Sequence, residues 1–347
     1  MTPAAPSTDA DAKAEATARD LAAKVTAGDL RALARAITLL ESGRADHRAQ
    51  AEALVRALLP ASGTSIRIGI TGIPGVGKST FIEAFGLALV ERGHRVAVLA
   101  VDPTSPRSGG SILGDKTRME KLARSRNAFI RPSPSGGTLG GVARRTREAV
   151  IAVEAGGYDV VLIETVGVGQ SETAVKDLVD MFLLLLAPGG GDDLQGIKKG
   201  IVEMADLIVV NKADGDLAPA AERARRDYAS ALHLLRPETA DWTPRVVKCS
   251  AVTGDGLDDI WKAAEAFRKA TGASGRFARR RAEQARAWMW NEVNETLLGE
   301  LRAAPAVRRA LADLEPAVAQ GTVGPGEAAR RILATFAGTG GGSNEGT

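Results

Sequence analysis

The chain has a single cysteine, Cys249, among its 347 residues, so neither a disulfide framework nor a thiolate metal cluster can form within it. Its histidines, His47, His94 and His233, are scattered and lack the spacing of metal ligands. The net charge of +3 is too small to indicate a nucleic-acid partner without a focused basic patch. These scarcities argue against disulfide-rich, metal-cluster and nucleic-acid-binding proteins.

Long apolar runs are also missing from the sequence. The stretch from Met181 to Ala187 is far too short to cross a bilayer. The first residues carry Asp9, Asp11 and Glu15 and contain no apolar segment typical of a targeting peptide. We therefore expect a cytoplasmic protein without a membrane partner.

The two ends of the chain differ in composition from its middle. Residues 1–15 are rich in Ala, Pro, Ser, Thr and Asp and are predicted to be a disordered tail, whereas residues 16–60 have the periodicity of an N-terminal helical extension. Residues 61–272 are predicted to form the main domain. Residues 273–336 have the pattern of a C-terminal helical arm, and the glycine-rich residues 337–347 are predicted to be a flexible tail.

The strongest concentration of charge lies at the start of this arm. It consists of arginines interleaved with alanines and Glu283, namely Arg276, Arg279, Arg280, Arg281 and Arg286. Such a pattern is typical of a solvated helix face, and we expect these side chains to be exposed.

Apolar runs alternate with helical stretches within residues 61–272. The predicted strands are Ile66–Thr71, Val96–Val101, Val160–Glu164, Met181–Leu186, Leu207–Asn211 and Val246–Ser250. Continuous apolar strands separated by helices are typical of a mostly parallel sheet that is covered on both faces. Ligand-binding loops then meet at the carboxyl edge of that sheet. The predicted fold class is therefore α/β, with a mostly parallel central sheet flanked by helices.

A glycine-rich stretch after the first predicted strand has the form of a phosphate-binding loop, G-x-x-x-x-G-K-[ST]. Its residues are Gly72, Ile73, Pro74, Gly75, Val76, Gly77, Lys78, Ser79 and Thr80. The glycines allow successive backbone N–H groups to turn inward, and a helix that begins at Lys78 adds its positive dipole end. Lys78 would reach the β- and γ-phosphate oxygens, and the Ser79 hydroxyl would hold Mg²⁺. The stretch predicts a nucleoside triphosphate site of the P-loop NTPase class.

A second motif, N-K-A-D at Asn211–Asp214, directly follows a later predicted strand. The Asp214 carboxylate can accept two hydrogen bonds from the N1–H and amino group of guanine, a donor pair that adenine lacks. Asn211 can tie this loop to the phosphate loop, and the stem of Lys212 can lie along the purine. Backbone N–H groups of Ser250–Ala251, after the last predicted strand, could contact guanine O6. The motif favours GTP and GDP over adenine nucleotides.

Acidic side chains that could hold Mg²⁺ follow other strands. Glu164 precedes Gly167, whose N–H could meet the γ-phosphate, and its long arm suits a water-bridged metal contact. Asp102 and Asp115 are candidate metal or water ligands, or equally helix caps. Lys198, in a glycine-rich loop, could stabilise phosphate charge. The candidate catalytic residues are Lys78, Glu164, Asp102, Asp115 and Lys198, and no general base is evident.

Longer stretches around these residues resemble the MeaB/ArgK GTPases, which are associated with methylmalonyl-CoA mutase. The similarity runs from about residue 20 to residue 335. It is carried by D-P-T-S from Asp102, G-G-S-I-L-G-D-K-T-R-M from Gly109, E-T-V-G-V-G-Q-S-E from Glu164 and L-Q-G-I-K-K-G from Leu194.

This resemblance implies a homodimeric GTPase whose C-terminal helices form a dimerisation arm. It also implies a chaperone of an adenosylcobalamin-dependent acyl-CoA mutase, in which GTP binding and hydrolysis gate cofactor loading and protect or reactivate the mutase. By the same resemblance, Gly72 to Thr80 bind phosphate, Asp214 recognises guanine, and Ser250, Ala251 and Val252 complete the base pocket. Val252 stands where the more familiar loop pattern varies.

Other nucleotide-binding classes remain as alternatives. A nickel metallochaperone GTPase is expected to carry a Cys/His ligand cluster. A protein-targeting GTPase usually has a Met-rich domain, and this chain has five methionines. A MinD- or ArsA-type ATPase needs an additional lysine early in the phosphate loop, and Ile73 and Pro74 at those positions exclude this class. A transport-system-associated kinase, an older association of the family, needs an acceptor pocket that the sequence does not reveal.

Overall fold

A computed structural model of the protein describes residues 9–101, 119–132, 139–165, 175–188, 199–232 and 241–340. Its contacts divide the chain into two compact units, Met1–Gln284 and Ala285–Thr347. This boundary lies inside helix α13 (Arg276–Ala303), whereas the composition changes near residue 272. The first turns of α13 therefore belong to the first unit.

A seven-stranded sheet forms the centre of the first unit, with the strand order β3-β2-β4-β1-β5-β6-β7 and parallel pairing throughout. The strands are β1 (Ile66–Gly72), β2 (Val96–Val101), β3 (Ala128–Arg131), β4 (Val160–Thr165), β5 (Met181–Leu186), β6 (Leu207–Val210) and β7 (Arg245–Lys248). Each predicted strand is present within two residues of its expected bounds. The central strands are buried on both faces, which explains their continuous apolar sequences.

Helices cover the two faces of this sheet. They are α4 (Lys78–Glu91), α6 (Glu120–Ala123), α7 (Leu139–Ala155), α10 (Lys199–Met204), α11 (Ala218–Leu232) and α12 (Leu257–Ala273), with short 3₁₀ turns η1 (Leu59–Ala61) and η2 (Gly215–Leu217). On one face, Phe81 and Phe85 of α4 stack 5.5 Å apart and share a core with Ile68 of β1 and Phe267 of α12. Helix α7 contacts β2 and β4 on the other face.

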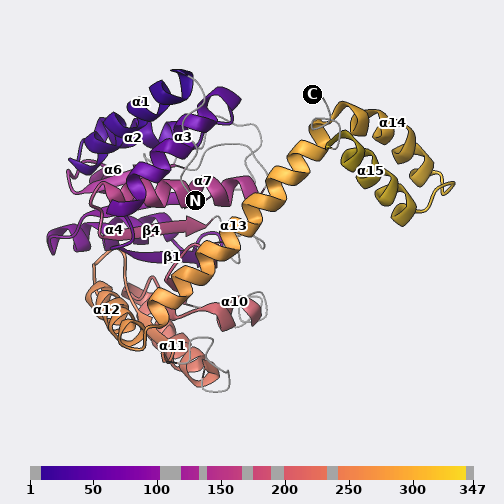
Figure 1. Cartoon of the computed structure of the whole chain (residues 1–347). Coiled ribbons are helices and arrows are strands. Elements are labelled where there is room, and N and C mark those ends of the chain that lie inside the picture. The colour runs from indigo at the N-terminus through magenta and orange to yellow at the C-terminus, as the bar shows by residue number, and fades with distance from the viewer. Residues whose placement is uncertain are drawn as a thin grey trace. The chain divides into compact units, whose positions relative to one another are not determined.

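Three N-terminal helices pack beyond α7, as Figure 1 shows. They are α1 (Asp9–Thr26), α2 (Leu30–Leu40) and α3 (Ala45–Leu58). The Asp29 side chain caps α2 by accepting hydrogen bonds from the N–H groups of Arg31 and Ala32. Residues 9–15, predicted as part of a tail, instead form the first turns of α1, because the Ala, Lys and Glu in this stretch are strong helix formers.

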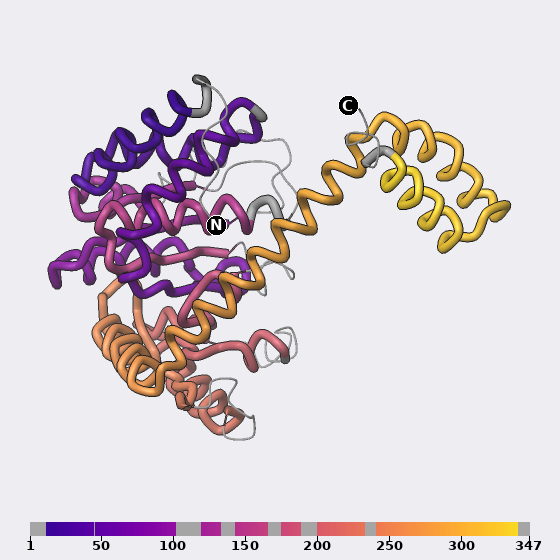
Figure 2. The backbone as a smooth tube through the Cα atoms, viewed as in Figure 1, coloured from indigo at the N-terminus to yellow at the C-terminus, as the bar shows by residue number. Residues whose placement is uncertain are grey.

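The second unit contains the rest of α13 together with α14 (Pro305–Ala319) and α15 (Pro325–Gly340). Figure 2 shows α14 and α15 running side by side, and Val307, Leu314 and Ala328 are buried within them. Within the described ranges, none of the helices is both long enough and apolar enough to cross a membrane.

Candidate functional site

The loop from Gly72 to Gly77 connects the carboxyl end of β1 to the start of α4 at Lys78. Gly77 has a left-handed backbone with φ of 88°, and a Cβ atom there would lie 3.1 Å from the Asn211 Nδ2. A side chain at this position would therefore be strained and would crowd the neighbouring loop. The strand, glycine loop and helix predicted for Gly72–Thr80 are all present, with the N-terminus of α4 facing the loop.

The Lys78 ammonium group lies over this loop. Its Nζ donates hydrogen bonds to the carbonyl oxygens of Gly72 at 2.7 Å and Ile73 at 3.3 Å. Phosphate oxygens are stronger acceptors for an ammonium group than these neutral carbonyls. The lysine is therefore placed where a bound phosphate could take over its hydrogen bonds.

Ser79 and Glu164, two of the predicted metal ligands, lie together. The Ser79 hydroxyl is 3.5 Å from Glu164 Oε1 at the end of β4. A hydroxyl and a carboxylate oxygen are the hard donors that Mg²⁺ prefers, so the pair fits this ion. Among the described residues, there is no group of three or more His, Cys, Asp or Glu side chains that could hold a metal.

Several predicted site residues lie outside the described ranges. These residues are Asp102, Asp115, Gly167 and Lys198. Their assignments as metal ligands, a γ-phosphate contact and a phosphate-stabilising cation therefore stay predictions.

Asn211 connects the base-recognition motif to the phosphate loop, as its motif predicts. Its buried amide Nδ2 donates to the carbonyl oxygen of Val76 at 3.0 Å. Its Oδ1 accepts hydrogen bonds from the Ala251 N–H at 3.3 Å and from the Cys249 thiol at 3.5 Å. One amide thus holds three segments together: the phosphate loop, the end of β6 and the loop after β7.

Lys212 makes a second connection between these loops. It has a left-handed backbone with φ of 58°, the one such conformation of a residue other than glycine in the described part of the chain. Its Nζ donates to the carbonyl oxygen of Gly75 at 2.8 Å. The unfavourable backbone, which costs roughly 1–2 kcal/mol for a side-chain-bearing residue, is held in place by these surrounding contacts.

The remaining predicted base-contacting residues lie beside Asn211. Asp214 is partly buried at the start of η2. Ser250 is fully buried, and its Oγ accepts hydrogen bonds from the N–H groups of Val252 and Thr253. The Val252 side chain is 80% exposed. The N–H groups of Ser250 and Ala251, predicted as possible contacts of guanine O6, donate in this structure to the Asp255 carbonyl oxygen at 2.9 Å and to Asn211 Oδ1 at 3.3 Å.

Sequence reasoning gave no role to Cys249, or to a buried pair of threonines. The Thr165 hydroxyl donates to the Thr71 hydroxyl at 2.9 Å and joins β4 to β1 just before the phosphate loop. Burial raises the pKa of the Cys249 thiol to about 12, so this group acts as a hydrogen-bond donor to Asn211. Their positions at or just after the ends of predicted strands were the available signal.

Residues 33–306 match the family model described as methylmalonyl Co-A mutase-associated GTPase MeaB. The chain belongs to the MeaB family. Over 305 residues it is 61% identical to a putative GTPase of Caulobacter vibrioides, in an alignment that covers 88% of this chain and 93% of that protein. Membership makes the protein a GTPase of the P-loop class that binds guanine nucleotides.

Two further relatives are informative about the MeaB family. Over 314 residues the chain is 50% identical to the methylmalonic aciduria type A homolog, mitochondrial, of Mus musculus, with 88% of this chain and 76% of that protein covered. A crystal structure described as an LAO/AO transport system kinase has 41% sequence identity and a TM-score of 0.74, covering 92% of this chain and 98% of that chain.

Proposed function

We propose that this MeaB-family GTPase is a chaperone of an adenosylcobalamin-dependent acyl-CoA mutase, with methylmalonyl-CoA mutase as the leading candidate. GTP binding and hydrolysis would gate cofactor loading and would protect or reactivate the mutase. The description of the family and the name of the mouse relative support this partner. The observation that carries the proposal is the pair of bonds from Asn211 and Lys212 to the phosphate loop. These bonds would couple recognition of the base to binding of the phosphates, which suits a guanine-nucleotide sensor.

Each site residue would have a separate role in GTP hydrolysis. Lys78 would neutralise β/γ-phosphate charge, and Asp214 would select guanine. Ser79 and Glu164 would hold Mg²⁺, which supplies further positive charge at the phosphates. Neither the sequence nor the described site offers an evident general base. Intrinsic hydrolysis is therefore expected to be slow, with the partner supplying or ordering the missing group.

We also propose that the second unit mediates a homodimer. Several of its large apolar side chains are exposed, namely Met289, Trp290, Val293, Leu297 and Leu298 of α13 and Leu333 of α15. Met289, Val293 and Leu297 are spaced four residues apart, so they share one helix face. Exposed apolar side chains that share a helix face are typical of an interaction site, and the family resemblance points to a second copy of the chain as the partner.

The proposed chaperone role is tested by phosphate release from GTP with the full-length protein. We expect slow release by the protein alone and acceleration of about tenfold or more when methylmalonyl-CoA mutase is added. An acyl-CoA enzyme that uses no cobalamin is the matched control and should have no effect. Equal rates with the mutase and with the control enzyme would overturn the proposed partner while leaving the GTPase activity established.

Phosphoryl transfer to a protein or an amino acid is a second candidate, because the solved relative at 41% identity is described as a transport system kinase. GTP labelled on its γ-phosphate separates the two functions. A chaperone GTPase releases all the label as inorganic phosphate. Label that remains on an amino acid or a protein would favour the kinase.

A further inference from the structure

A short segment, Val175–Asp180, precedes β5 and is buried almost throughout. Only Asp177 within it is exposed. The segment begins where the described chain resumes after β4, the strand that carries Glu164. It is thus connected in sequence to one side of the nucleotide site, while its far end lies at the amino edge of the sheet.

The segment packs directly on β1, the strand that leads into the phosphate loop. A Cβ atom on Gly69 of β1 would lie 3.0 Å from Val179 Cγ2 and 3.2 Å from Val175 Cγ1. These distances are shorter than ordinary van der Waals contact, so any larger residue here would force the segment to shift by a few tenths of an ångström. The segment is therefore in close contact with the central strand of the sheet.

The first turns of α13, which belong to the first unit, hold the same segment. The Gln284 amide donates to the carbonyl oxygen of Val179 at 2.9 Å, and Arg280 donates to that of Lys176 at 3.3 Å. Arg281 forms two hydrogen bonds with the Asp180 carboxylate, at 2.8 and 2.6 Å. Three side chains on one side of α13 thus contact a segment of six residues, counted from Val175 to Asp180.

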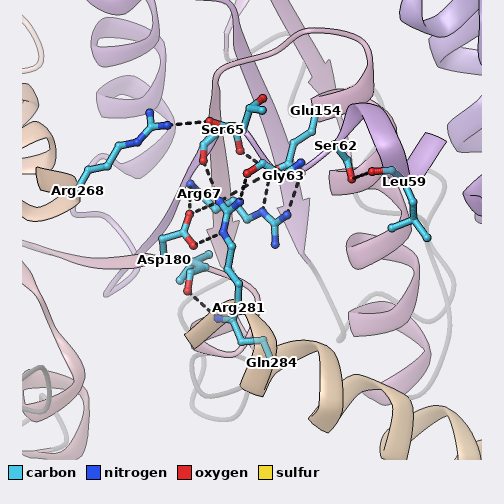
Figure 3. Close-up of polar contacts among 12 residues, drawn as sticks. Leu59, Ser62, Gly63, Ser65, Arg67, Glu154, Asp180, Arg268, Arg281 and Gln284 are labelled. Atoms are coloured by element: carbon cyan, nitrogen blue, oxygen red, sulfur yellow. Dashed lines mark hydrogen bonds and ion pairs between the residues drawn. The ribbon is translucent and has the colours of Figure 1, made fainter. Parts of the chain in front are cut away.

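Arg281 also joins a buried ion network at the amino edge, shown in Figure 3. It donates to the carbonyl oxygens of Gly63 and Ser65, and Glu154 accepts two hydrogen bonds from Arg67 at 2.8 Å each. Burial alone would lower the pKa of Arg281, but hydrogen bonds and the charges of Asp180 and Glu154 raise it. This network fixes the start of α13 to the sheet. The predicted exposure of the arginine cluster is wrong for Arg281.

Lys176 connects the segment to a second helix. Its ammonium group donates to the carbonyl oxygen of Met204, the last residue of α10, at 2.5 Å, and it lies 5.9 Å from the centre of the Phe182 ring. Helix α10 begins at Lys199, directly after the glycine-rich stretch that contains the predicted phosphate-stabilising Lys198. The segment is thus bonded to α13 and to α10 at once.

We propose that Val175–Asp180 is a link through which the nucleotide bound at the opposite edge of the sheet changes the position of the first turns of α13. Lys176, Arg280 and Gln284 are the positioning residues of this link. The inference rests on the proposed GTP-dependent function. The chain on one side of the segment leads to Glu164, and Lys176 ties it to the helix after Lys198. When the chain near Glu164 or helix α10 moves, the segment therefore shifts along β1. The bonds of Arg280 and Gln284 transmit this shift to α13.

The test uses hydrogen exchange with mass spectrometry on the full chain, bound to GDP or to a non-hydrolysable GTP analogue. In the wild type we expect exchange of residues 276–284 to differ by about threefold or more between the two states. The double variant Arg280→Met, Gln284→Leu should reduce this difference, although the bonds of Arg281 to Asp180 remain. The Oε1 of Gln284 is buried without a hydrogen-bond partner among the described residues, so leucine removes an unpaired acceptor together with the bond to Val179. The Arg281 network stays intact.

Lys176→Met tests the other end of the link and should likewise reduce the nucleotide-dependent difference at residues 276–284. Arg268→Met is the matched control, because Arg268 donates to the carbonyl oxygen of Thr64 at the same edge and, among the described residues, has no hydrogen bond or ion pair with the segment. This control should keep the full difference. A residue with a merely structural role would raise exchange equally in both nucleotide states.

Three outcomes would overturn the link. The wild type could bind the analogue and show no difference at residues 276–284, or the double variant could keep the full difference. Arg268→Met could also reduce the difference as much as the double variant does. If the analogue does not bind at all, the proposed function itself fails, and the link fails with it.

Discussion

The two edges of the sheet use polar side chains in opposite ways. At the carboxyl edge, Lys78 and Lys212 donate to backbone carbonyl oxygens of the phosphate loop. At the amino edge, Arg67 is bound to Glu154 and Arg281 to Asp180 in a buried network. A cation on a neutral carbonyl can exchange that bond for a phosphate oxygen, whereas a cation paired with a buried carboxylate has no such alternative. The carboxyl edge is therefore suited to binding and the amino edge to anchoring.

We expect the largest effect on stability from removing a carboxylate of the buried network at the amino edge. Glu154→Ala leaves Arg67 buried without its carboxylate, and we expect the free energy of unfolding to fall by about 3–5 kcal/mol. Urea denaturation followed by circular dichroism measures this loss. Affinity for GTP should stay near that of the wild type.

Glu222→Ala is the matched control for this variant. Glu222 also contacts three basic residues, Arg225, Arg226 and Lys248, but its side chain is 27% exposed whereas that of Glu154 is fully buried. Its removal should change the denaturation midpoint little. An equal loss in both variants would show that burial is not what distinguishes the amino edge.

Lys78→Ala removes a cation of the phosphate loop at the carboxyl edge instead. Losing a charge-assisted contact with the phosphates should weaken GTP binding by about 100-fold in isothermal titration calorimetry. Without nucleotide we expect a smaller loss of stability than in Glu154→Ala, because the hydrogen bonds of Lys78 to Gly72 and Ile73 are made to neutral carbonyl oxygens. An unchanged affinity would contradict the placement of the phosphates at this loop. Lys262→Ala, on the surface of α12, is the control.

Gly69→Ala tests the strand that connects the two edges. The added methyl group would lie 3.0 Å from Val179, so we expect a loss of about 1–3 kcal/mol in the free energy of unfolding. Gly272→Ala in α12 meets open space and should stabilise the helix by up to about 1 kcal/mol. An unchanged free energy of unfolding in Gly69→Ala would show that the segment does not pack tightly against β1.

The smallest effect is a pH dependence of stability from Glu154. Burial alone would raise the pKa of Glu154, but Arg67, Ser65 and Arg281 together hold it below the ordinary value of 4.5. The stability that this carboxylate contributes is therefore fully present above pH 4.5 and is lost as the pH falls through the lowered pKa. Denaturation midpoints measured between pH 7 and pH 3 should decline less steeply in Glu154→Gln than in the wild type. Parallel declines would rule out Glu154 as the source.

The sequence predicts the parts of this fold whose signal is local. Five of the central and flanking strands lie in apolar runs that end at Thr71, Val101, Glu164, Leu186 and Asn211, and the phosphate loop is contiguous between Gly72 and Thr80. Strand β3 was missed because Ala128–Arg131 is short and ends in a charged residue. Its place comes from pairing with β2 and from the ion pair of Arg131 with Glu41.

The anchoring edge could not be predicted because its residues are far apart in sequence. Ser65, Glu154, Asp180 and Arg281 each look like an ordinary polar residue in its own neighbourhood. Arg281 in particular stands in the arginine-rich, alanine-rich first turns of α13, where no apolar stripe shows which side is buried. Only the fold brings these side chains together.

The single cysteine has a practical consequence for spectroscopy. Cys249 is 1% exposed and carries a thiol that stays protonated at neutral pH, so maleimide and iodoacetamide reagents should pass it by in the folded protein. A fluorophore or spin label could then be placed at an introduced surface cysteine with the native one left in position. Motions of α13 could be followed by such labels without disturbing the thiol that supports Asn211.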